Sequence, residues 1–397
     1  MRKAVFVLVV TLVVSLTLFF AYPVNAEVRG VTSDSLKLGI IADMTGLIPD
    51  TWGPVTDAIK TYSRYLNDQG GVHGRKIKLV VEDDRFSIPI ALGAFKKLLY
   101  RDKILALVGG SGQGQTYAII PQVEKEKVPL LAVVADPKYI IPPRRYIFGI
   151  LPFYSDQVKI FFEYLSKDIK VKNPKIAFLY MDSASSKPLV PLVRKLANEY
   201  GASLVEIVIP IAGGLDMTSE VLRLKKENPD YILLNSYISN TASVLKAAKN
   251  FKFERPFTVT QYGAADTTIE LAKGAAAGLM GINCFGSYKD DSPGMKKARE
   301  IKEKYDPGSG HQTSDYVQGW FIGLLIEEGL KRAGRNLNGE TLIQGLESIK
   351  GLDTKGVCGI VNCSPTNHKT IEYHRILKAN IEKAIFVPIT GWRKAKE

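Results

Sequence analysis

Short apolar runs alternate with amphipathic segments along most of the chain. A short apolar run bounded by Gly, Pro or Asn predicts a buried strand, whereas apolar residues spaced three and four apart predict a helix. The first half of the chain is predicted to have strands at residues 36–41, 77–81, 104–108 and 130–134, and helices at 54–66, 89–100 and 115–127. This order is typical of a parallel sheet with helices on both faces.

A second series with the same rhythm begins after Pro152. It is predicted to have helices at 155–168, 189–200, 219–227 and 241–251, and strands at 175–180, 203–208, 231–234 and 257–260. Helices at 294–305 and 315–332 and strands at 371–377 and 385–387 follow. The two series predict an α/β fold of two doubly wound parallel-sheet lobes, each with a ligand-binding edge at the carboxyl ends of its strands.

The first 26 residues have the pattern of an export signal. Arg2 and Lys3 precede an apolar stretch at residues 4–21, which is followed by Pro23 and by small residues ending at Ala26. This pattern predicts a signal peptide cleaved after Ala26 and therefore a periplasmic protein. An uncleaved anchor is the alternative, because the apolar stretch is nearly long enough to span a bilayer.

Charge and cysteine content narrow the class of protein. The chain has 397 residues, enough for two or three domains, and 53 Lys and Arg against 40 Asp and Glu give it a formal charge of +13. The basic residues are spread along the chain and are not interleaved with aromatics, so we expect a solvated surface and no nucleic-acid partner. Cys358 and Cys363 are close enough in sequence for a small disulfide loop, but spacing alone leaves that bond open.

The sequence contains no motif typical of a metal site, a cofactor site or a set of catalytic residues, so we expect none of these. The four histidines lack zinc-ligand spacing, and we expect surface or loop positions for His73, His311, His368 and His374. Ser111 lies in a near match to the nucleophile elbow of hydrolases, but Gln113 stands where the closing Gly is required. A secreted serine hydrolase that uses Ser111 is the enzyme alternative. The Gly-rich turn at 109–114 otherwise suits a ligand carboxylate at a helix N-terminus, or is a plain tight turn.

Several segments occur in a recognisable order. They are Thr45-Gly46 with Trp52-Gly53, the stretch NDQGGVHGRKI at residues 67–77, Glu82-Asp83-Asp84, and Val108-Gly109-Gly110 followed by Val128-Pro129. Together they resemble the type I periplasmic binding proteins of the branched-chain amino acid (Leu/Ile/Val-binding) ABC transporter family, in which the second stretch has the form Asn-x-x-Gly-Gly-Val-x-Gly. The resemblance runs from about Leu36 to about Pro388.

The resemblance implies a chain that crosses between two lobes three times. Lobe 1 would then hold residues 27–153 and 285–354, and lobe 2 residues 154–284 and 355–397. The family binds a small-molecule solute between the lobes, and hinge closure makes the form that the permease subunits of the ABC transporter recognise. We expect a monomer without enzymatic activity. A sensor that reports a ligand to a signalling partner is the alternative on the same fold.

The resemblance also places ligand-binding residues in lobe 1. Trp52 stands near the aromatic residue that packs against the ligand side chain. Gln113 and Gly114 replace the Ser-Gly pair that holds the ligand carboxylate, with Ser111 two residues away. Ala135 and Asp136 fall in a loop that usually carries Ser or Thr. An ionised Asp can only accept hydrogen bonds, and the alternative for Asp136 is a helix N-cap for residues 137–139.

In lobe 2, Tyr237 matches a frequent aromatic contact, and Gln261 falls near the acidic residue that pairs with the ligand ammonium. A neutral amide forgoes that charge-assisted hydrogen bond. Further aromatic residues are candidates for the pocket wall: Tyr117, Tyr180 and Tyr262. We therefore predict a small organic ligand other than leucine, isoleucine or valine, either amino-acid-like or an aromatic or carboxylate compound.

Overall fold

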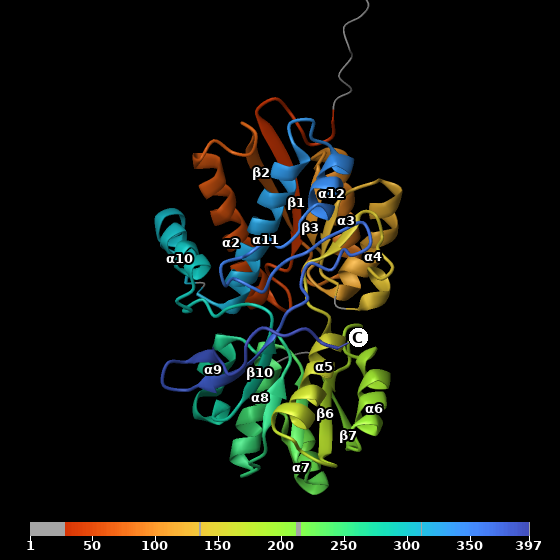
Figure 1. Cartoon of the computed structure of the whole chain (residues 1–397), viewed down its shortest axis with the longest axis vertical. Coiled ribbons are helices and arrows are strands. Elements are labelled where there is room, and N and C mark those ends of the chain that lie inside the picture. Colours follow the sequence, from red (N-terminus) through yellow and green to blue (C-terminus); the bar gives the residue numbers. More distant parts are fainter. Residues whose placement is uncertain (1–27, 135, 212–215, 311, 397) are drawn as a thin grey trace, which may run out of the picture.

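The computed structural model shows two α/β lobes, one above the other, joined by crossing segments (Figure 1). It describes residues 28–134, 136–211, 216–310 and 312–396. The predicted signal peptide and Ala135 lie outside these residues. Among the described helices, none combines the length and the apolar character that a membrane span requires.

The sheet of lobe 1 contains five parallel strands in the order β2-β1-β3-β4-β5. These strands are β1 (Ser35–Ala42), β2 (Lys76–Asp83), β3 (Ala106–Gly109), β4 (Leu130–Ala132) and β5 (Ile147–Gly149). Side chains alternate between the two faces of β1, so Leu38 and Ile40 join one core whereas Ile41 joins the other. This burial on both faces explains why the strand is almost continuously apolar.

Helices cover both faces of this sheet. One core contains residues of α2 (Pro49–Asp68), α10 (Pro293–Tyr305), α11 (Ser314–Ala333) and α12 (Gly339–Glu347), and the other contains residues of α3 (Ile88–Lys96) and α4 (Gln113–Lys125). Helix α2 begins at Pro49, five residues before the predicted start at Pro54, because Pro49 also suits the first turn of a helix. Helices α2 and α11 pack closely at Gly319, where a Cβ atom would lie 2.2 Å from the Val55 carbonyl oxygen.

The sheet of lobe 2 is mixed, in the order β12-β11-β10-β9-β8-β6-β7. The strands β6 (Lys175–Met181), β7 (Ser203–Ile209), β8 (Tyr231–Asn235), β9 (Phe257–Val259) and β10 (Met280–Asn283) are parallel to their neighbours in this group. The C-terminal strands β11 (Arg375–Asn380) and β12 (Ile385–Pro388) add antiparallel pairs. Residues 371–374, predicted as strand, precede β11.

Helices also enclose the lobe 2 sheet. One core contains residues of α5 (Tyr154–Glu163) and α6 (Leu189–Glu199), and the other contains residues of α7 (Thr218–Glu227), α8 (Ile238–Asn250) and α9 (Asp266–Ala272). The predicted alternation of strands and helices is confirmed. The sequence pattern missed the short strands β5 and β10. It also missed the helices α9 and α12, each of which has fewer than ten residues.

The chain passes between the lobes in three places (Figure 1). The first passage follows β5 and the second follows β10. The third was expected at residues 354/355, yet Val357, Val361 and Ile371 belong to the core of lobe 1. The chain therefore packs against lobe 1 until shortly before β11. Lys369, in this last segment, forms an ion pair with Asp156 of α5 and so links the third passage to the first.

The cysteines and two histidines are more buried than their sequence context indicates. Cys284, Cys358 and Cys363 are buried free thiols, so the disulfide left open by their spacing is not formed. His368 and His374 were expected at the surface or in loops, and both are buried, His368 against β5 and α12 of lobe 1. The His368 ring stacks on Phe148 with 4.0 Å between centroids. No cluster of described residues has the composition of a metal site.

Candidate functional site

A small enclosed cavity lies between the lobes where strands of both sheets end. Its volume is about 20 Å³, which is room for about one water molecule. Lobe 1 contributes Ile48, Thr51, Trp52, Ser111, Gly112, Gln113, Val133 and Leu151, and lobe 2 contributes Tyr154, Tyr237 and Tyr262. Several of these residues lie in the turns that follow β3, β4, β8 and β9 along the chain. The cavity thus lies at the carboxyl ends of parallel strands, where open α/β sheets bind ligands.

Trp52 forms the base of the lobe 1 wall and fixes the turn after β3. Its side chain is 2% exposed, and its Nε1–H donates to the Ser111 carbonyl oxygen at 2.6 Å. The turn needs glycine at Gly109, where φ is +103° and a Cβ atom would lie 2.3 Å from the Ile41 carbonyl oxygen. The Gly-rich segment is therefore shaped by its packing against β1 and Trp52.

Asp84 holds the same turn from the other side. Its carboxylate accepts hydrogen bonds from the Ser111 N–H at 3.1 Å and from the Phe86 N–H at 3.0 Å. Burial raises the pKa of Asp84, which these hydrogen bonds partly oppose. The Ser111 hydroxyl is buried in the cavity wall next to the Asp84 carboxylate, and their interaction is among those that oppose the rise in the pKa of Asp84.

Gln113 begins α4, and Gly112 precedes it in extended conformation. The first N–H groups of a helix have no partner within the helix and carry partial positive charge, so this end of α4 suits an anionic or polar ligand group. The Tyr117 hydroxyl donates to Gln113 Oε1. Tyr117 in turn stacks on Tyr139, with ring centroids 3.6 Å apart. The Gln113 side chain is thus held at the wall by an aromatic pair.

Three tyrosines form the lobe 2 wall. Tyr154 begins α5, Tyr237 precedes α8, and Tyr262 follows β9. The Tyr237 and Tyr262 rings meet edge to face, with centroids 6.1 Å apart. Burial raises the pKa of Tyr237 to about 12 and raises the pKa values of Tyr154 and Tyr262 as well. The wall is therefore neutral at physiological pH and offers aromatic surface with hydroxyl groups at its edge.

The structure brings five of the predicted site residues to the cavity wall: Trp52, Ser111, Gln113, Tyr237 and Tyr262. The other described candidates lie elsewhere. Tyr180 packs on the α5 and α6 face of the sheet and stacks on Phe178 at 5.0 Å. Gly114 is the second residue of α4 and faces Ile88.

Asp136 and Gln261 also have other partners. Asp136 caps the short helix Pro137–Tyr139 by accepting from the Lys138 N–H at 3.1 Å, which confirms the N-cap alternative. Gln261 is buried, and its Oε1 lies 3.5 Å from the Cys284 sulfur. The Gln261 N–H donates to Gln157 Oε1 at 2.9 Å. In this arrangement the Gln261 side chain contributes to packing between the crossing segments and does not line the cavity.

Sequence reasoning missed six lining residues: Ile48, Thr51, Gly112, Val133, Leu151 and Tyr154. Most are small or apolar and resemble ordinary core residues in sequence. Tyr154 carried a usable signal, because it follows Pro152 at the start of the second series of elements. Thr51 lies in the first turn of α2 and Ile48 is the N-cap residue before it, so the earlier start of the helix would have pointed to both.

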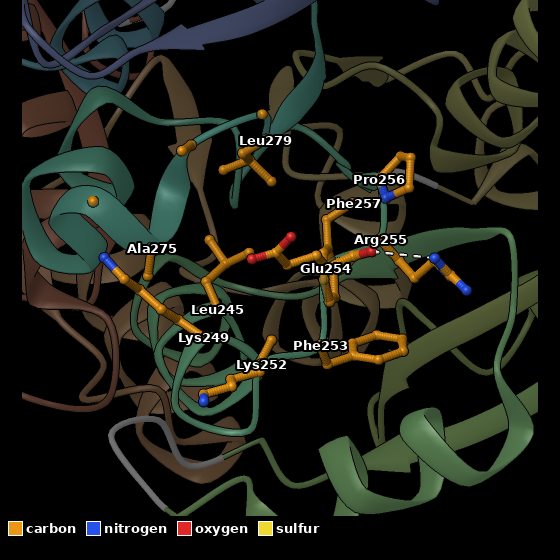
Figure 2. Close-up of a pocket in the computed structure, with 14 residues that line it drawn as sticks. Leu245, Lys249, Lys252, Phe253, Glu254, Arg255, Pro256, Phe257, Ala275 and Leu279 are labelled. Atoms are coloured by element: carbon orange, nitrogen blue, oxygen red, sulfur yellow. Dashed lines mark hydrogen bonds between the residues drawn. The ribbon is translucent and has the colours of Figure 1, made fainter.

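A larger hollow of about 570 Å³ lies in lobe 2 alone. Figure 2 shows the side chains around it, including Lys249, Lys252 and Arg255, whose guanidinium donates to the Glu254 carbonyl at 3.4 Å. Phe257 begins β9 and Leu279 precedes β10, so this hollow lies at the amino ends of the strands. The position is opposite to the usual ligand edge, and lobe 1 contributes no wall to it.

Comparison with known proteins identifies the class of this two-lobed chain. The model of a family described as periplasmic binding protein matches residues 35–384. The chain belongs to this family. The chain is therefore a periplasmic binding protein, without enzymatic activity of its own, and it acts outside the cytoplasm.

Curated relatives in this family are distant. The chain is 24% identical over 344 residues to "Leu/Ile/Val-binding protein homolog 7" of Brucella suis biovar 1, an alignment that covers 82% of this chain and 80% of that protein. It is 21% identical over 326 residues to "Leucine-specific-binding protein" of Salmonella typhimurium, covering 81% and 87%.

Solved structures of periplasmic binding proteins share the fold. A branched-chain amino acid ABC transporter protein from Thermus thermophilus with bound valine gives a TM-score of 0.83 at 24% identity, over 91% of this chain and 97% of that one. A fatty acid ABC transporter substrate-binding protein from Thermomonospora curvata gives 0.80 at 22% identity, over 93% and 94%. The likeness at these identities extends to the fold, which accommodates different ligands.

Proposed function

We propose that this periplasmic binding protein captures a small organic solute between its lobes by hinge closure and delivers it to membrane permease subunits. The main support for the proposal is that both lobes contribute side chains to the cavity wall. Lobe 1 contributes Trp52, Ser111 and Gln113, and lobe 2 contributes Tyr237 and Tyr262. A solute held by both sets contacts them together only when the lobes are closed. Its binding therefore favours the closed form.

The wall chemistry supports a ligand with a polar head and an apolar or aromatic body. The start of α4 and the Ser111 hydroxyl suit a carboxylate, whereas the tyrosines and Trp52 suit apolar or aromatic surface. The cavity of about 20 Å³ in the closed arrangement is too small for such a molecule. We infer that the lobes separate or wall side chains turn when solute enters.

We further propose that the solute is not leucine, isoleucine or valine. In the family, an acid pairs with the ligand ammonium near the position of Gln261. That residue is here a neutral amide turned toward Cys284. Loss of one charge-assisted hydrogen bond costs about 1.5–3 kcal/mol, or roughly ten- to a hundredfold in affinity. The α-amino acid clamp is therefore weakened in this chain.

Two measurements test the proposed function. Mass spectrometry of the exported protein, isolated without dialysis, is expected to find a bound small molecule released on denaturation. Unfolding and refolding the protein removes any bound solute. Calorimetric titration of this solute-free protein with leucine is expected to show no micromolar binding. Micromolar binding of leucine would refute the proposed selectivity, and failure to bind or carry any solute would refute the function itself.

A further inference from the structure

Two buried hydrogen-bond acceptors lie next to each other on α11 without partners. Asp315 is 4% exposed and Gln318 is 1% exposed. Residues three apart are neighbours on a helix surface. Asp315 Oδ2 and Gln318 Oε1 both have no hydrogen-bond partner among the described residues. Buried polar atoms are nearly always paired, so two adjacent exceptions indicate a missing donor.

The two acceptors lie behind a residue of the interlobe cavity. The Gln318 side-chain amide interacts with the Tyr262 hydroxyl, and the Asp315 carboxylate is close enough to contribute to the raised pKa of Tyr262. Tyr262 belongs to lobe 2 and lines the cavity, whereas α11 belongs to lobe 1. Asp315 and Gln318 therefore lie at the lobe interface, one side chain away from the solute site.

The groups that face Asp315 from neighbouring elements supply no positive charge. They are Asp50 in the first turn of α2, Asp266 in the first turn of α9, and the phenol of Tyr262. Asp266 differs from Asp315, because it accepts hydrogen bonds from the Phe386 N–H at 2.8 Å and the Ser287 hydroxyl at 2.9 Å. Closure thus brings acidic groups of opposite lobes together and leaves Oδ2 of Asp315 without a donor, although a backbone N–H donates to the Asp315 carboxylate.

The protonation state of Asp315 depends on its burial and on these neighbouring acidic groups. Burial first, and then the charges of Asp266 and Asp50, raise its pKa to about 7. A cation placed against Asp315 reverses these effects and favours the ionised carboxylate. Binding of such a cation therefore releases a proton at mildly acid pH, when the empty protein holds Asp315 protonated.

We propose that Asp315 and Gln318 form a subsite for a protonated nitrogen of the solute, either an ammonium or a guanidinium group. This inference rests on the proposed binding of a solute between the lobes and names one part of its chemistry. Several N–H donors on one cationic group satisfy both acceptors and offset the charge of the interlobe acids. Movement of Tyr262, as the small cavity widens, brings the subsite into contact with the solute.

Matched probe pairs test the subsite by calorimetric titration of the full mature chain. L-arginine with L-citrulline and L-phenylalanine with 3-phenylpropanoate each differ in one cationic group. We expect a cationic member to bind at least about tenfold tighter than its partner. Its affinity should rise by about tenfold per pH unit up to about pH 7 and be constant above about pH 8.

Variants of α11 separate the subsite from a structural role. Asp315→Asn keeps the side-chain shape, and Gln318→Met removes the acceptor at similar length. Both are expected to remove the preference for the cationic probe, and Asp315→Asn also removes its pH dependence. Glu328→Gln, which changes an ion pair with Arg332 on the same helix, is the control and should alter neither. Circular dichroism and the Tm verify that each variant is folded.

Three results overturn the subsite. They are equal binding within both probe pairs, an unchanged preference in folded Asp315→Asn, and a co-purified solute that has no protonated nitrogen. The last result leaves the proposed function intact, because a solute is then still bound between the lobes. A chain that neither carries nor binds any solute overturns the proposed function together with the subsite.

Discussion

His374 makes the stability of this protein sensitive to acid. Its side chain is fully buried, and burial together with the nearby charge of Lys369 lowers its pKa from 6.5 to about 3, although the backbone of Glu372 partly opposes the shift. Because the unfolded chain takes up a proton near pH 6.5 and the folded chain does not, stability contributed by neutral His374 is present above pH 6.5 and is lost as pH falls toward 3.

The magnitude follows from the difference between the two pKa values. At 1.36 kcal/mol for each pKa unit, the complete effect is about 5 kcal/mol, and about 3 kcal/mol of it is lost between pH 7 and pH 4.5. That loss is a large fraction of the ~5–15 kcal/mol that stabilises a typical domain. His374 lies where the third crossing segment enters β11, so the effect acts on the connection between the lobes.

Urea unfolding of the wild type and of His374→Phe at both pH values measures this effect. Carboxylates that titrate in the same range act equally on both proteins and cancel in the comparison. We expect the wild type to lose about 3 kcal/mol more than the variant between pH 7 and pH 4.5. His73→Asn, at an exposed histidine, is the control and should follow the wild type. Equal acid losses in the wild type and His374→Phe would refute the reasoning.

Two further predictions concern the turn after β3 and the thiols. Gly109→Ala places a methyl group against the Ile41 carbonyl at positive φ, and we expect a loss of at least about 1–3 kcal/mol in thermal or urea unfolding. Gly308→Ala, which meets nothing within 4 Å, should be nearly neutral, and an equal cost in both variants would contradict the assigned strain. The buried thiols of Cys284, Cys358 and Cys363 should react with a thiol reagent only after the protein is unfolded, and no reductant should be needed. Fewer than three reactive thiols in the unfolded protein would contradict their free state.

Much of the architecture was predictable because it depends on local patterns. The apolar runs that became β1, β3 and β6 and the helical spacing in α4 and α8 are signals within ten or so residues. The order of these segments indicated lobes with ligand edges at the strand ends. The third crossing was misplaced because residues 355–371 have little regular structure, and their lobe depends on which core accepts Val361 and Ile371.

The candidate site was predictable only in part, and strand geometry explains one failure. Successive side chains of a strand point to opposite faces, and this alternation places Tyr180 with Phe178 against α5 and α6. Tyr237 and Tyr262 follow their strands, and the turns after β8 and β9 direct them into the cavity. Gln261 precedes Tyr262 directly, yet its side chain turns toward Cys284.

By itself, the sequence determined the alternating strands and helices, the two series of elements, and the turn in which Ser111 and Gln113 lie. The tertiary structure decided which distant side chains meet. It placed Tyr154 opposite Trp52, left the thiols of Cys358 and Cys363 unpaired, and brought Asp315 of one lobe toward Asp266 of the other. Local patterns specify elements because neighbouring residues set backbone conformation, whereas a site between lobes depends on packing across long separations in the chain.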